Sequence, residues 1–314
     1  MALNPQAQAM VDLLAARGDR PVEDSTVAQV RRANWDWVEF QGEREPVGHV
    51  RDTYILGPTA ELHVRVYTPE GGGPFPCLVM FHGGGWTAGN IELADRPHRS
   101  LTNATGCVVV AVNYQKAPEH QFPTALDDCF ATLEWVLEEA AALGIDPAKV
   151  GVAGDSAGGN LAAAVCLKAR DVAGVGLAFQ LLIYPALDPD LDFPSARENA
   201  DGYALTTAAM RCFWDYYAPD AAQRIDSLAA PLRTPSLHDL PPAIVVTAGY
   251  DPLRDEGECY ADRLEEAGIS VIRHRYPSTI HGFLWMAAAL TDDFRRLMTD
   301  LGRDVSSILG ADSR

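Results

Sequence analysis

The chain has 314 residues, of which 47% are hydrophobic and 22% are charged, and it carries a formal net charge of −18 at pH 7. This balance is that of an ordinary globular protein and excludes a disordered or fibrous chain. Because a strongly acidic surface would repel a phosphate backbone, nucleic acid is not an expected partner.

Neither a membrane segment nor a metal site is predicted. Residues 1–20 lack the basic start and apolar stretch of a secretory signal, and no apolar run reaches the roughly 18 residues of a membrane-spanning helix. The six cysteines are scattered along the chain, without Cys-x-x-Cys pairs or the spacing of a zinc site. We interpret them as reduced core cysteines in a cytoplasmic protein.

From about residue 60 onward, short apolar segments alternate with helix-like segments. Several of the apolar segments are β-branched and apolar on both faces, as in parallel strands that helices cover on each side. This alternation predicts an α/β fold with a mostly parallel, twisted sheet and helices on both faces. The predicted strands are Leu62–Tyr67, Cys77–Phe81, Cys107–Asn113, Val150–Ala153, Phe179–Tyr184, Ala243–Thr247 and Ser270–Arg275, and the predicted helices include Ala125–Leu143, Ala157–Ala169 and Arg254–Ala267.

Two segments interrupt this alternation. Residues 1–45 are helix-like and rich in charge and tryptophan, and residues 190–235 form an insertion between two predicted strands that contains many aromatic residues. We interpret these segments as the N-terminal part and the inserted part of one helical cap above the strand ends. Residues 46–189 and 236–314 are then the first and second parts of the α/β core.

The sequence Gly154-Asp155-Ser156-Ala157-Gly158 is the only Gly-x-Ser-x-Gly in the chain, and it lies between a predicted strand and a predicted helix. A sharp strand-to-helix turn needs residues without bulk beside the serine. Such a turn exposes the hydroxyl above the sheet, at the positive end of the following helix. The pattern predicts Ser156 as a nucleophile, and its alternative is a glycine-rich turn with a bystander serine.

A second glycine-rich segment, His82–Trp86, directly follows the predicted strand Cys77–Phe81. Its three glycines let the backbone approach a substrate and point N–H groups at a carbonyl oxygen that becomes negative during attack. The N–H of Ala157, just after the nucleophile, would complete such an oxyanion hole. We expect His82 to hold the glycine loop through a hydrogen bond rather than to transfer protons.

A base and an acid are expected after the nucleophile, in the order acid and then histidine. His281 lies in a loop just beyond the last predicted strand, and Asp251 lies in the equivalent loop one strand earlier. Loops at strand ends are where a parallel sheet presents catalytic groups. Of the other histidines after Ser156, His274 lies inside a predicted strand and His238 lies in a proline-rich stretch.

Other polar residues near these motifs have structural interpretations. Asp255 is the rival acid, but it is predicted inside the helix that follows Asp251. Glu119 and His120 are expected to brace a turn. Asp155 is expected to bond to nearby backbone, because its neighbour in the turn must point the other way.

Together these motifs resemble the hormone-sensitive-lipase-like group of microbial carboxylesterases, over essentially the whole chain. The matching segments are His82–Trp86, Gly154–Gly159, Asp251–Gly257 and His281–Phe283, with a further match around Asn113-Tyr114 and residues 117–123. The chain departs from the family at Gln115-Lys116, where Arg-Leu is usual, but that stretch is structural in the family.

The resemblance implies an α/β-hydrolase fold with a helical cap and no cofactor or metal. It implies that Ser156, Asp251 and His281 form a catalytic triad. It also implies a homodimer, formed through the last strand near Ile269–Tyr276. The implied donors of the oxyanion hole are Gly84, Gly85 and Ala157, with Gly83 as a further candidate.

The predicted function is that of a serine carboxylesterase, which hydrolyses short- to medium-chain esters through an acyl-enzyme on Ser156. Its partners would be a small-molecule ester and water. A cap fits a closed pocket, and no helix resembles those that adsorb to lipid surfaces. The candidates for the lining of that pocket are Trp86, Tyr184 and Trp214.

Two alternatives remain open at this point. An amidase or peptidase could use the same triad, because the same nucleophile attacks both kinds of carbonyl. A non-catalytic small-molecule receptor could share the fold, although such receptors typically lose a triad member and all three are present here.

Overall fold

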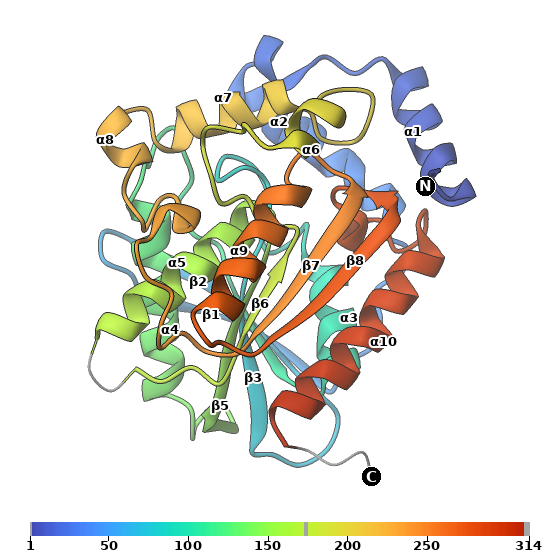
Figure 1. The fold of residues 1–314 in the computed structure, drawn as a ribbon. Coiled ribbons are helices and arrows are strands. Elements are labelled where there is room, and N and C mark those ends of the chain that lie inside the picture. Colours follow the sequence, from blue (N-terminus) through green and yellow to red (C-terminus); the bar gives the residue numbers. More distant parts are fainter. Residues whose placement is uncertain (1, 173–174, 311–314) are drawn as a thin grey trace.

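The computed structural model describes residues 2–172 and 175–310, and its centre is one eight-stranded sheet. The strand order is β1-β2-β4-β3-β5-β6-β7-β8; the pairs β1–β2 and β2–β4 are antiparallel and every other pair is parallel. The mostly parallel sheet that the sequence predicts is confirmed (Figure 1). The strands are β1 His49–Leu56, β2 Glu61–Thr68, β3 Phe75–Phe81, β4 Val108–Val112, β5 Ile145–Asp155, β6 Gln180–Ile183, β7 Ala243–Tyr250 and β8 Val271–Ile280.

The edge strand β1 is absent from the sequence prediction, and its burial explains why. Only Ile55 of its eight residues is buried, because β1 pairs with a neighbour on one side alone and its faces are largely exposed. Its sequence therefore lacks the continuous apolar run by which the central strands were recognised.

Helices cover both faces of the sheet. On one face lie α4 (Thr124–Glu138), α5 (Ala157–Asp171) and α9 (Arg254–Glu266), and on the other lie α3 (Asp95–Thr105) and α10 (Thr291–Ile308). The predicted helix Ala125–Leu143 is too long, because the chain leaves the helix after Glu138 and continues in turns to residue 144.

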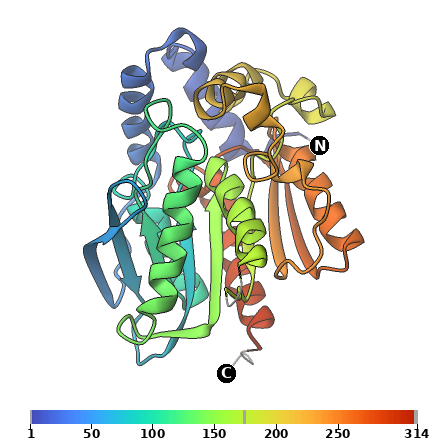
Figure 2. The same ribbon diagram turned by 90° about the vertical axis from the view of Figure 1, so that its left-hand side faces the viewer.

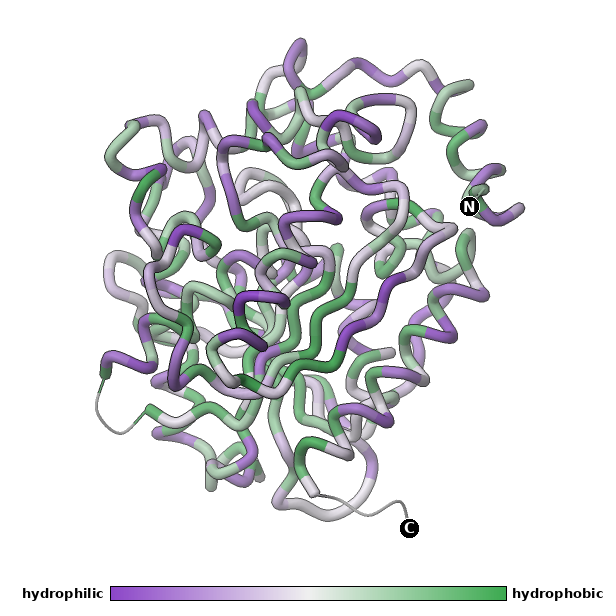
Figure 3. Tube along the Cα trace, viewed as in Figure 1, coloured by the Kyte–Doolittle hydropathy of each residue, from purple (hydrophilic) through white to green (hydrophobic). Residues whose placement is uncertain are grey.

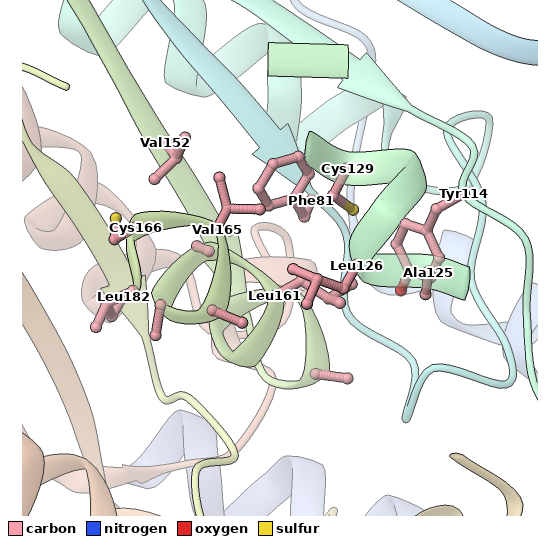
Figure 4. Packing of buried hydrophobic residues seen from close by; sticks show 14 of the residues in the cluster. Phe81, Tyr114, Ala125, Leu126, Cys129, Val152, Leu161, Val165, Cys166 and Leu182 are labelled. Carbon is pink, nitrogen blue, oxygen red and sulfur yellow. The ribbon is translucent and has the colours of Figure 1, made fainter. Parts of the chain in front are cut away.

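The core lies where α4 and α5 pack on the central strands. Leu126 of α4 and Leu161 of α5 lie beside each other between these two helices, and both belong to the same cluster of buried residues as Phe81 and Val152 (Figure 4). The central strands are almost entirely hydrophobic, whereas hydrophobic and hydrophilic residues alternate along the outer helices (Figure 3). This packing fixes β5 and α5 relative to one another, and the turn between them carries Ser156.

The two segments outside the α/β alternation lie over the same end of the sheet (Figures 1 and 2). We refer to residues 1–45 and 190–235 as the cap segments. The first contains α1 (Pro5–Arg17), η1 (Val22–Asp24), α2 (Val27–Ala33) and η2 (Asn34–Phe40), and the second contains α6 (Pro194–Glu198), α7 (Thr207–Tyr217), α8 (Ala221–Arg224) and η3 (Pro231–Arg233). They meet where α7 packs against η1. No helix in residues 2–172 and 175–310 is both long and apolar enough to cross a membrane.

The core packing predicts a sharp contrast between two leucines. Leu161 of α5 is fully buried, whereas Leu56 of β1 is 85% exposed. We expect Leu161→Ala to lower the free energy of unfolding by about 2–5 kcal/mol, because it leaves a cavity in the core. We expect Leu56→Ala to change it by less than about 0.5 kcal/mol. Urea titration measures both, and equal losses would contradict this description of the core.

Candidate active site

Ser156 lies at a strained turn between β5 and α5. Its backbone has φ 56° and ψ −120°, a conformation that residues with side chains rarely adopt. Glycines make the turn possible, since a Cβ on Gly154 would lie 2.0 Å from the carbonyl oxygen of Gly158. This is the geometry of a nucleophile elbow, which holds the serine hydroxyl clear of the sheet.

Ser156, His281 and Asp251 form one hydrogen-bonded row. His281 Nε2 is 3.0 Å from Ser156 Oγ, and His281 Nδ1 is 2.7 Å from Asp251 Oδ2. The three residues follow the carboxyl ends of β5, β8 and β7, and all are buried. The loops that the sequence analysis selected are thus brought together from positions up to 125 residues apart.

The carboxylate of Asp251 is held on its other side as well. Its Oδ1 accepts a hydrogen bond from the Leu253 N–H at 2.8 Å, and Asn199 of the inserted cap segment donates to its backbone carbonyl at 3.1 Å. With one oxygen committed to the backbone, the other faces His281. This arrangement can fix the orientation of the imidazole and stabilise it when it becomes charged.

The rival residues of the sequence analysis lie elsewhere. Asp255 is in α9, where its carboxylate accepts from the Ser195 N–H at 2.8 Å and from Arg254 at 2.6 Å. His274 pairs with Asp304, and His238 is an exposed residue bonded to a backbone carbonyl.

The glycine loop after β3 approaches Ser156 from the other side. Gly84 and Gly85 have φ values of 120° and 60°, and a Cβ on Gly85 would collide with the ring of Phe213. Their N–H groups, and that of Ala157 at the start of α5, donate to no acceptor within the described part of the chain. Such free N–H groups are what a negatively charged oxygen requires.

Gly83 must be removed from the candidate oxyanion donors. Its N–H already donates to Asp155 Oδ1 at 2.8 Å, so it cannot also serve an oxyanion. The same bond agrees with the expectation that Asp155 bonds to nearby backbone. A second donor, Trp285 Nε1, reaches Asp155 Oδ2 at 2.7 Å.

His82 supports the loop from beneath. Its Nδ1 lies 2.8 Å from the carbonyl oxygen of Gly83, and its ring stacks on Tyr114 at a centroid distance of 4.4 Å. Burial lowers the pKa of His82 well below its usual range, so the ring is neutral and Nδ1–H is the donor. This is the supporting role that the sequence predicts for it.

A cavity of about 230 Å³ opens above Ser156, between the core and the cap segments. Its core side includes the glycine loop, and most of its remaining wall is apolar and comes from the cap. The lining residues are Arg20, Val22, Ser25, Gln29, Val30, Ala33, Asn34, Trp37, Gly83, Gly84, Gly85, Ala88, Asp155, Ser156, Ala204, Leu205, Ala209, Met210, Phe213, His281, Gly282 and Trp285.

The three aromatic residues predicted to line the pocket are not on its wall. Trp86 and Trp214 lie behind it, packed on each other at 4.5 Å and on Tyr217, and Tyr184 lies against the His281 ring at 4.6 Å. All three side chains are fully buried.

The sequence analysis missed Trp37 and Trp285, which supply aromatic surface to the wall. Trp285 had a usable signal, since it follows His281 by four residues and so shares its loop. Trp37 had a weaker one: the sequence predicts that residues 1–45 belong to a cap above the strand ends, but it does not indicate which of their side chains face Ser156. No group of three or more His, Cys, Asp or Glu in residues 2–172 and 175–310 could hold a metal ion.

Comparison with known proteins gives a consistent set of relatives. Residues 78–285 match the family described as alpha/beta hydrolase fold. The carboxylesterase NlhH of Mycobacterium tuberculosis is 42% identical over 71% of this chain and 72% of its own, and an arylesterase of Saccharolobus solfataricus is 41% identical over 77% and 79%. The structure of an ester-hydrolase from the metagenome of Lake Arreo superimposes with a TM-score of 0.93 at 39% identity, over 98% of this chain and 99% of that one.

Asp155 gives the site a pH dependence of its own. Burial raises the pKa of Asp155 to about 6, so the carboxyl gains a proton and loses its charge as the pH falls through that value. Its bonds to Gly83 and Trp285 then weaken. Asn at this position does not titrate, and its amide nitrogen faces one of the two donors. We therefore expect Asp155→Asn to lower kcat/KM about 10–100-fold at about pH 8.

The ratio of variant to wild-type kcat/KM, followed from about pH 8 to about pH 5, separates this effect from pH effects that both proteins share. We expect the ratio to rise towards one as the pH falls, because the wild type then loses the negative charge at position 155 that the variant lacks at every pH. The exposed Asp239→Asn is the matched control. A ratio that stays constant with pH would show that the charge on Asp155 does not support the loop.

Proposed function

We propose that this chain, which belongs to the α/β-hydrolase-fold family and is a carboxylic ester hydrolase of its hormone-sensitive-lipase-like branch, works through an acyl-enzyme on Ser156. The observation that carries the proposal is the hydrogen-bonded row of Ser156, His281 and Asp251 beneath a cavity. A nucleophile, a base and a group that orients the base are the components that acyl transfer needs.

In the first half-reaction, Ser156 Oγ attacks the ester carbonyl carbon while His281 Nε2 takes its proton. Asp251 stabilises the imidazolium that results. The tetrahedral intermediate collapses when His281 returns the proton to the leaving alkoxide, which departs as an alcohol. In the second half-reaction, water attacks the acyl-enzyme with His281 as base, and the carboxylic acid leaves as Ser156 recovers its proton.

The negative charge of each tetrahedral intermediate would fall on an oxygen beside Ser156. The N–H groups of Gly84, Gly85 and Ala157 are the proposed donors to it. Their value lies in being fixed before the reaction begins, so that no reorganisation is needed when the charge forms. The Gly83 N–H donates to Asp155 and the Gly83 carbonyl oxygen accepts from His82, and these two bonds support the donors by holding the loop in place.

The cavity favours short to medium acyl chains. Its volume of about 230 Å³ is below the roughly 300–1,000 Å³ usual for sites that enclose drug-sized ligands. The proposed cap, residues 1–45 and 190–235, supplies most of its apolar wall, so each added methylene is favourable only while the cavity has room for it.

The setting of the enzyme is also a proposal. We propose a cytoplasmic protein, in support of which all six cysteines are unpaired and four of them are buried. We also propose a homodimer formed through β8, near residues 269–276, because β8 is the last strand on its side of the sheet and no further strand within the described chain pairs with it.

Hydrolysis of p-nitrophenyl esters from acetate to palmitate tests the reaction. We expect activity to be greatest at short to medium chains and to fall once the acyl group exceeds the cavity. Ser156→Ala and His281→Ala should each lower kcat at least about 10⁴-fold, because the triad acts as a unit. Ser307→Ala and His238→Ala, both exposed and away from the site, are the matched controls.

Retention of activity in Ser156→Ala would refute the proposed nucleophile. A matched anilide series separates ester from amide hydrolysis. Faster turnover of the anilides than of the esters would contradict the assignment of the ester as substrate.

A further inference from the structure

Arg31 of α2 ties the N-terminal cap segment to the loop that carries the oxyanion donors. Its Nε donates to the carbonyl oxygen of Thr87 at 2.9 Å, and its Nη2 donates to the carbonyl oxygen of Ala117 at 3.1 Å. The same guanidinium holds the Glu119 carboxylate with two bonds of 2.8 and 2.6 Å. One side chain therefore joins α2 to two segments that lie 56–88 residues further along the chain.

The carbonyl of Thr87 belongs to the turn that begins at Gly84. The N–H groups of Thr87 and Ala88 both donate to the carbonyl oxygen of Gly84, at 3.1 and 2.8 Å. In addition, the Ala117 N–H donates to the carbonyl oxygen of Trp86 at 2.9 Å. If Thr87 moved, the hydrogen bonds from the Thr87 and Ala88 N–H groups to the Gly84 carbonyl would also move the Gly84–Gly85 peptide. This is the peptide that presents the Gly85 N–H.

Another part of α2 faces the substrate cavity. Gln29, Val30 and Ala33 line the cavity above Ser156, whereas Arg31 lies outside it. The helix is therefore both a wall of the substrate site and the origin of a bond to the oxyanion loop.

We infer that Arg31 is a positioning residue for ester hydrolysis: through its bonds to Thr87 and Ala117 it holds the oxyanion loop in the geometry that the transition state requires. The inference rests on the proposed acyl-enzyme reaction at Ser156. Arg31 touches no reacting atom. It acts on the placement of the Gly84 and Gly85 N–H groups.

The bonds to the two carbonyls matter more than the ion pair with Glu119. The Glu119 side chain is 53% exposed and that of Arg31 is 37% exposed, and ion pairs between such groups contribute little to stability. Thr87 and Ala117 are both fully buried. Lysine could keep the charge beside Glu119, but its single ammonium group cannot reproduce the planar fork that spans both carbonyls.

The test compares Arg31→Ala, Arg31→Lys and Glu119→Gln with Arg32→Ala, which removes an exposed neighbour that has no partner within the described chain. Each variant is assayed on p-nitrophenyl butyrate, for its melting temperature, and for inhibition by butylboronic acid, whose tetrahedral adduct with serine mimics the transition state. Ser156→Ala is measured alongside wild type, so that a failure of the acyl-enzyme proposal is seen separately.

We expect Arg31→Ala and Arg31→Lys to lower kcat about 10-fold or more with little change in KM, since small misplacements of catalytic groups are costly. The inhibition constant of the boronic acid should rise in parallel. Glu119→Gln should stay within about 2-fold of wild type, as should Arg32→Ala. If Arg31→Ala fails to fold, kcat and boronic acid affinity are compared between Arg31→Lys and Arg32→Ala, both at an unchanged melting temperature.

Two results would overturn the inference. In the first, Arg31→Lys matches Arg32→Ala in kcat and in boronic acid affinity while wild type is active and Ser156→Ala is not. In the second, the Arg31 variants raise KM but leave kcat and boronic acid affinity unchanged, which would assign Arg31 to the shape of the cavity alone.

Discussion

Ser156 is held with a positive φ by the strand before it and the helix after it, and the whole site depends on that constraint. β5 is paired on both sides within the sheet, and α5 is buried along nearly its whole length, so neither element can move to relieve the turn. The strain is therefore balanced by core packing. In return, the hydroxyl stands free of the backbone, 3.0 Å from the imidazole of His281.

The second half of the site is coupled to the first through Asp155. Because the turn directs Ser156 upward, the side chain before it points away, towards the glycine loop and Trp285. The same turn therefore places the nucleophile and anchors the loop that would receive the negative charge of the intermediate. Trp285 lies just after His281, so this one buried carboxylate links the turn at Ser156, the glycine loop and the loop that carries His281.

How much of this could be read from the sequence varies with the kind of interaction. The central strands were predictable because burial on both faces leaves a continuous apolar run. Ser156 and Asp251 were predictable as site residues because they follow such strands, and His281 because it follows the last strand that the sequence predicts. β1 was not, since an edge strand with one buried residue carries no such run. The pocket wall was also beyond reach: Trp37 and Phe213 line the same cavity only through the packing of the two cap segments, whereas Trp86 and Trp214 are fully buried. That Gly83 has no free N–H follows from its bond to Asp155, which no sequence pattern encodes.

Reaction with a p-nitrophenyl alkylphosphonate would test the nucleophile without depending on how fast an acyl-enzyme is hydrolysed, because the phosphonyl adduct is stable. We expect activity to be lost in step with the release of about one equivalent of p-nitrophenolate per chain. Peptide mass analysis should then find the phosphonyl group on Ser156. Loss of activity with the label on any other residue, or full labelling of Ser156 with activity retained, would contradict the mechanism.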